Sequence, residues 1–196
     1  HRTLAAKRRS DITHLPCVVF KTADVKTEAR GFLDLNTGRK PVTAVAKQKA
    51  MVAAGDEVAA FVQKTCDALG VTIRPTASKA GEIKCVAWCV KRAAENAEAF
   101  TQVLAFGAEI SRADNMPIPE RVLEGIWILN AKCGEGLADK KLAKRLREKG
   151  ARALLDAANR AAAYYVSGGG KVWAQGMLAE INKGLQRKFT MDGIEA

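Results

Sequence analysis

The chain has few of the residues on which metal sites and hydrolytic triads depend. It contains two histidines, His1 and His14, and five cysteines without regular spacing. We therefore predict no Ser/His/Asp or Cys/His catalytic set. We also predict no metal site, because Cys85 and Cys89 lie one helical turn apart without histidine partners. An odd number of scattered cysteines is typical of a reduced, cytoplasmic protein.

Long apolar runs are also missing. No stretch approaches the roughly 20 residues that a transmembrane helix needs. The first residues, HRTLAAKRRSD, are basic but lack the apolar centre of a signal peptide. We therefore expect no membrane partner. Hydrophobic residues make up 48% of the 196 residues, which is enough for a sizeable core in one domain or in a small domain with an extension.

Acidic residues are scarce relative to basic ones, with 21 Asp and Glu against 32 Lys and Arg and a net charge of +11. The excess is uneven: residues 1–40 carry +5 and residues 139–196 carry +6, whereas 41–80 carry +2 and 81–138 carry −2. Two basic regions around a nearly neutral middle favour a polyanion as the partner, above all DNA. A basic protein whose charges are simply solvated fits the same numbers.

Hydrophobic periodicity predicts a mainly α-helical fold. Two segments instead favour strands, HLPCVVF at 14–20 and VTIRP at 71–75. A lone buried strand cannot satisfy its own backbone, so we expect further strands before His1. The expected helices cover about 24–38, 42–54, 56–70, 83–90, 100–104, 119–134, 139–150, 151–166 and 171–189, with a glycine hinge at 168–170.

The helix at 139–150 is the most cationic segment of the chain. Asp139 is placed to cap it, and only Leu142 and Leu146 form an apolar seam. A solvated helix face more often alternates in sign, and here Glu148 is the only acid after the cap. We therefore predict that this helix follows a phosphate backbone. The predicted DNA-binding residues are Lys140, Lys141, Lys144, Arg145, Arg147 and Lys149.

A polar corner, FLDLNTGRKPV at 32–42, interrupts the first long helix. Asn36 continues the apolar face of Phe32 and Leu33, where a buried amide without partners costs about 1–3 kcal/mol. One interpretation is a helix C-cap, because Asn tolerates left-handed geometry. The other is an oxyanion site, because Arg39 follows at once and a guanidinium donates two parallel hydrogen bonds to phosphate.

The segment LNTGRKPV at 35–42 resembles the Asn-x-x-Arg box of the ParB and sulfiredoxin-like nucleotide-binding domain. In that family the box partners an earlier motif, Gly-x-His/Arg-Arg, which many relatives write as Asp-Gly-Gln-His-Arg. The chain begins HRTLAA, which looks like the last two residues of that motif entering its helix. The order of motif, helix, strand, helix and Asn box agrees over residues 1–54.

The resemblance implies a division of the chain and a ligand. Residues 1–54 would be the carboxy-terminal part of a ParB-like α/β domain, preceded by the rest of it, and residues 55–196 a helical domain. Arg2 would contact a nucleotide or phosphate with His1 at its edge, Asn36 would help to hold phosphate, and Arg39 would clamp it. The implied cofactor is a nucleoside triphosphate, CTP or ATP, with Mg²⁺. Leu35 stands where partition proteins commonly carry Glu, so phosphate binding is better supported than hydrolysis.

The leading hypothesis is a cytoplasmic ParB-like DNA-binding protein of bacterial, plasmid or phage type, in which a bound nucleotide repositions the helical domain against DNA or a second subunit. The resemblance leaves a homo-oligomer open. An enzyme of the same fold, a nuclease, phosphotransferase or nucleoside triphosphatase, is the first alternative, with its catalytic residues unknown. A non-catalytic assembly protein that has lost the ligand is the second.

Overall fold

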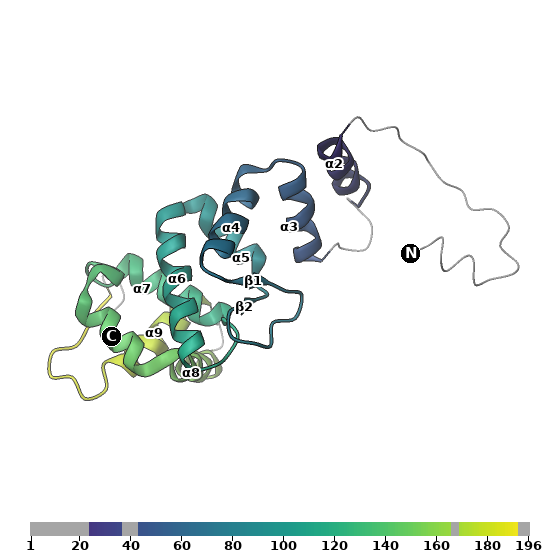
Figure 1. Cartoon of the computed structure of the whole chain (residues 1–196). Coiled ribbons are helices and arrows are strands. Elements are labelled where there is room, and N and C mark those ends of the chain that lie inside the picture. Colours follow the sequence, from purple (N-terminus) through teal and green to yellow (C-terminus); the bar gives the residue numbers. More distant parts are fainter. Residues whose placement is uncertain (1–23, 37–42, 166–168, 192–196) are drawn as a thin grey trace, which may run out of the picture.

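The structure is a computed structural model that describes residues 24–36 (side chains to residue 34), 43–165 and 169–191. Within these residues the fold is mainly helical, as predicted, with eight α-helices and one two-stranded sheet. The helices follow one another from α2 at one end of the molecule to α8 and α9 at the other (Figure 1). None of the described helices is long and apolar enough to cross a lipid bilayer.

Three helices begin at the aspartates where the sequence predicts their first residues. Asp24, Asp56 and Asp139 each accept a hydrogen bond from a backbone N–H of the first turn, at 2.8, 2.8 and 2.7 Å. The helices are α2 (Val25–Asn36), α3 (Ala44–Ala53), α4 (Glu57–Ala68), α5 (Val86–Glu95), α6 (Ala97–Ala113), α7 (Glu120–Lys132), the 3₁₀ turn η1 (Gly136–Ala138), α8 (Lys140–Tyr164) and α9 (Gly170–Ile181).

Two short strands separate α4 from α5. Strand β1 (Thr72–Ile73) pairs in parallel with β2 (Glu82–Ile83), which confirms the extended segment predicted at 71–75. The prediction that Ile83 begins a helix was wrong. Ile83 pairs with Ile73 in the sheet instead, and α5 starts only at Val86. The strand predicted at 14–20 lies outside the described residues.

The first two described helices contact the rest of the fold through α3. Helix α2 packs on α3, and α3 packs on α4 and α5. Phe32, which was predicted to face inward, is 43% exposed, because α2 has a neighbour mainly on one side. Gln48 of α3 is buried and donates to the carbonyl of Ala59 at 2.8 Å. The boundary predicted after residue 54 therefore falls between helices in contact, and the division into two domains stays a prediction.

The core is one continuous cluster that extends from α4, the two strands and α5 to α6, α7, α8 and α9. Leu142 and Leu146 of α8 are fully buried, which confirms the seam predicted for the basic helix. Other large, fully buried side chains are Ile83, Phe100, Leu104, Ile110, Leu123, Ile126, Leu129, Leu154, Met177 and Ile181. This core fixes the orientation of α8, so that its remaining residues face α6, α9 or solvent.

One ion pair is enclosed between α5 and α7. Glu124 accepts hydrogen bonds from the Trp88 indole at 2.7 Å and from Arg92 Nε at 3.1 Å, and its second oxygen contacts Arg92 Nη2. The side chains of Arg92 and Glu124 are each 13% exposed. The Arg92 guanidinium also lies 5.0 Å from the centre of the Trp127 ring. Most of the hydrogen-bonding capacity of Glu124 is thus used inside the protein.

Candidate nucleic-acid interface

Helix α8 is broken at Gly150, where the predicted basic helix ends and the alanine-rich segment begins. Gly150 has φ 74° and ψ 168°, a backbone conformation open almost only to glycine. Asp114, at the end of α6, caps the second half of α8 by accepting the N–H of Arg152 at 2.8 Å. A Cβ on Gly150 would lie 2.7 Å from the same carboxylate oxygen. The break bends α8 around the end of α9.

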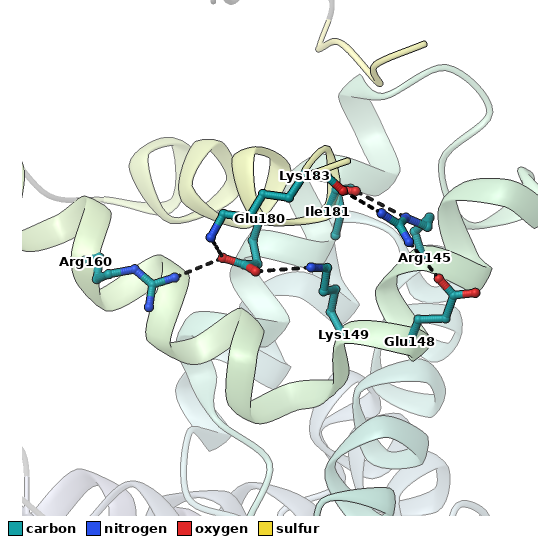
Figure 2. Close-up of polar contacts among 7 residues, drawn as sticks. All are labelled: Arg145, Glu148, Lys149, Arg160, Glu180, Ile181 and Lys183. Atoms are coloured by element: carbon teal, nitrogen blue, oxygen red, sulfur yellow. Dashed lines mark hydrogen bonds and ion pairs between the residues drawn. The ribbon is translucent and has the colours of Figure 1, made fainter. Parts of the chain in front are cut away.

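The carboxyl end of α9 lies among cations of α8 (Figure 2). Arg145 donates to the carbonyl oxygens of Ile181 at 3.3 Å and Lys183 at 2.9 Å. Glu180 accepts from Lys149 at 3.2 Å, and also from Arg160 at 3.0 Å and Lys183 at 2.7 Å. Cations at a helix C-terminus satisfy its last carbonyls and offset its partial negative charge. Part of the basic helix therefore holds the fold together.

The stability that this cluster contributes depends on pH through the ionisation of Glu180. The hydrogen bond from Lys183, supported by Lys149, lowers the pKa of Glu180 from its ordinary value near 4.5, against the effect of burial. Because the pKa of Glu180 is lower in the folded state, ionised Glu180 stabilises the folded protein at pH values above the pKa of the unfolded state. This contribution is lost as the pH falls through the folded-state pKa.

We expect Glu180→Gln to lower the free energy of unfolding at pH 7 by about 1–3 kcal/mol, because three cations lose a charged partner. The difference from the wild type should shrink as the pH falls below about 4. Urea unfolding of both proteins between about pH 7 and pH 3 measures it. A gap that stays constant over this range would contradict the assigned role of Glu180.

The six residues predicted to bind DNA divide into two groups. Arg145 and Lys149 contact α9, as described above. Arg147 turns toward α6, where it donates to Glu109 at 2.6 and 3.2 Å and lies 4.9 Å from the centre of the Phe106 ring. The other three, Lys140, Lys141 and Lys144, are exposed.

A second group of exposed cations follows α9. They are Lys183 and, in the loop after it, Arg187 and Lys188. Arg145 joins the two groups, because it belongs to α8 and hydrogen-bonds the carbonyl of Lys183. Reciprocal hydrogen bonds between Asn182 and Phe189, at 2.8 and 2.9 Å, hold the loop. We define the basic surface as Lys140, Lys141, Lys144, Lys183, Arg187 and Lys188.

The charge balance around the basic surface is strongly positive. Residues 139–149 and 180–191 together contain nine Lys and Arg against three Asp and Glu. Of these acids, Glu180 is only 12% exposed, Asp139 is used as a helix cap, and Glu148 is 42% exposed and pairs with Arg145 at 3.0 Å and Lys144 at 3.9 Å. Much of the net charge of +11 is therefore concentrated in these two segments. The sequence pattern found the part on α8 but missed the loop, whose only signal was the short cluster at 187–188.

The phosphate-binding side chains of the predicted corner lie outside the described residues. His1, Arg2 and Arg39 lie outside the described residues. Asn36 is the last residue of α2, and its side chain is also outside the description. Whether these four residues meet in one site stays a prediction. Only Gly169 and Gly170 of the predicted hinge are described, as the cap and first residue of α9.

The described residues contain no group of three His, Cys, Asp or Glu side chains placed to hold a metal ion. Burial raises the pKa of the Cys66 thiol to about 12, so this cysteine is a poor ligand and nucleophile. Residues 71–85 form the two strands and their connection, so no recognition helix directly follows the turn after α4.

Comparison with known proteins finds no match. This holds for family models, for curated proteins and for solved structures. The resemblance of residues 1–54 to the ParB and sulfiredoxin-like domain therefore stays a prediction, and the function has to be argued from the residues themselves.

Proposed function

We propose that the protein binds DNA through the basic surface of α8 and the loop after α9. The observation that supports this is the concentration of exposed cations on these two segments. Arg145 and Lys149 are half-buried and bonded within the protein, whereas the six cations of the basic surface are exposed. Two of the six also have an internal partner: Lys144 lies 3.9 Å from Glu148, and Lys183 donates to Glu180 at 2.7 Å. A surface of this kind attracts a phosphate backbone and releases its counterions.

The fold would position the basic surface in two steps. The break at Gly150 bends α8 around the end of α9, and Arg145 then fixes the start of the following loop beside the first turns of α8. Phosphates contacted by Lys140, Lys141 and Lys144 could thus extend toward Arg187 and Lys188. Contacts of lysine and arginine to phosphate do not depend on the identity of the bases, so we expect the binding to be weakly sequence-specific.

Replacing three lysines of α8 tests the proposal. We expect Lys140→Ala/Lys141→Ala/Lys144→Ala to weaken binding of duplex DNA at least about tenfold at about 100 mM salt, as measured by fluorescence anisotropy. A matched control removes the same charge elsewhere: Lys64, Lys79 and Lys91 are exposed residues of α4, of the connection between the strands and of α5. Their triple alanine variant should stay within about twofold of the wild type. Equal losses in both variants would show a non-specific effect of net charge.

The nucleotide-linked switch is a second part of the proposal and rests on the resemblance of residues 1–54. Isothermal titration of the full-length protein with CTP, ATP and GTP in the presence of Mg²⁺ tests it. We expect heat with at least one nucleotide, and its loss in Arg39→Ala, because a guanidinium clamps phosphate oxygens in pairs. An absence of heat with all three would remove the switch and leave DNA binding by the basic surface standing.

A further inference from the structure

Two tyrosines stand exposed at the end of α8. The side chains of Tyr164 and Tyr165 are 83% and 49% exposed, and their rings lie 5.3 Å apart with an angle of 81° between the planes. Both rings line a groove of about 340 Å³ between α8 and α9. Two neighbouring tyrosines with this much exposed ring area form a small aromatic patch, and such a patch beside a groove marks a candidate binding site.

Helices α8 and α9 approach closely beside the groove. A Cβ on Gly176 would meet the carbonyl oxygen of Ala157 at 2.6 Å and the Cβ of Ala161 at 2.7 Å. Half of the lining beside the tyrosines consists of such small residues, and the other half is polar or charged. Apart from the tyrosines, the described residues that line the groove include no long apolar side chain.

The rim of the groove is cationic on its open side. Arg160 and Lys183 line it, with side chains 64% and 63% exposed, and each uses part of its donor capacity on Glu180. The Glu180 carboxylate is 12% exposed, so the surface potential is set mainly by the two cations. Lys183 also belongs to the basic surface. A polyanion on that surface therefore reaches the groove without crossing a neutral region.

We propose that this groove binds unpaired bases of single-stranded nucleic acid, which stack on Tyr164 and Tyr165 while the adjacent phosphates contact Arg160 and Lys183. The inference rests on the proposed function and names the form of nucleic acid that the surface prefers. Aromatic rings beside cations bind single strands because every base has a π-face, whereas the bases of a duplex are already stacked on one another. The basic surface alone would not discriminate between the two forms.

The test uses three fluorescein-labelled probes of equal length: an oligothymidine, a duplex, and a strand of abasic residues that keeps the phosphates but has no bases. We expect Tyr164→Ala/Tyr165→Ala to weaken binding of the oligothymidine roughly tenfold or more. Binding of the duplex and of the abasic strand should change less than about twofold. The matched control, Tyr164→Phe/Tyr165→Phe, keeps the rings and should retain most of the affinity. Circular dichroism checks that all variants are folded.

The pattern of results shows which of the two proposals, DNA binding by the basic surface or base stacking in the groove, is overturned. If the wild type binds no probe even at low salt, the proposed function and this inference both fail. If it binds and the lysine variant of α8 is weakened, but the tyrosine-to-alanine variant binds all three probes like the wild type, only the groove assignment is overturned. An equal loss on the abasic strand would likewise overturn it, because stacking needs bases.

Discussion

Replacing Gly150 with alanine should lower the free energy of unfolding by about 2–4 kcal/mol. The backbone at this residue has φ 74° and ψ 168°, which costs a side chain-bearing residue about 1–3 kcal/mol. In addition, the new Cβ would lie 2.7 and 2.9 Å from the two carboxylate oxygens of Asp114. Asp114 would have to move, and the N–H of Arg152 would lose its acceptor. Urea unfolding measures the change.

Gly184 offers a matched control for this variant. Its φ is +77°, close to that of Gly150, but a Cβ there meets nothing within 4 Å. Gly184→Ala should therefore show the backbone cost alone, about 1–2 kcal/mol. In the proposed arrangement the break in α8 positions the basic surface, so Gly150→Ala should also weaken DNA binding under conditions where the variant is still folded. A Gly150→Ala protein as stable as the wild type would show that the break is not required.

Replacing Glu124 with alanine should destabilise the protein by about 2–4 kcal/mol. The change leaves the Arg92 guanidinium, 13% exposed, without its main partner, and the Trp88 indole N–H without its acceptor. Removing one member of a largely buried ion pair costs more than the pair contributes, because the remaining charge stays desolvated. Urea unfolding followed by tryptophan fluorescence measures the loss, since Trp88 reports on the same site.

The other carboxylate on Arg92 provides the comparison. Glu95 accepts from Arg92 Nη1 at 2.5 Å, but its side chain is 41% exposed. Glu95→Ala should therefore cost no more than about 1 kcal/mol, because water replaces the lost contact. If the two alanine variants are equally stable, enclosure of Glu124 between α5 and α7 does not set the strength of this pair.

Much of the fold could be predicted from the sequence, because helix caps and apolar spacing are local signals. Asp56 and Asp139 mark helix starts, and Leu142 with Leu146 marks a buried face. Ile83 shows the limit of this method. It is buried in β2, and periodicity alone assigned it to the helix that follows. Pairing with β1 ten residues earlier decides its structure, and such contacts leave no local pattern.

The basic surface could be predicted only in part for the same reason. A run of lysines and arginines marks a cationic helix, but it does not reveal which cations have partners elsewhere in the chain. Arg145 and Lys149 contact α9 more than 30 residues later, at Ile181 and Glu180. In the sequence, Tyr164 and Tyr165 look like ordinary members of an alanine-rich helix, and only the structure shows that both are exposed.

The salt dependence of DNA binding tests the central claim most directly. Anisotropy of a labelled duplex would be measured with the wild type and with Lys140→Ala/Lys141→Ala/Lys144→Ala between about 50 and 200 mM salt. If the six exposed cations of the basic surface contact phosphates, log Kobs should fall against log salt with a slope of about −3 to −5, and the variant should lose about 2–3 of that slope. No binding at low salt, or the same slope in both proteins, would contradict the assignment of this surface.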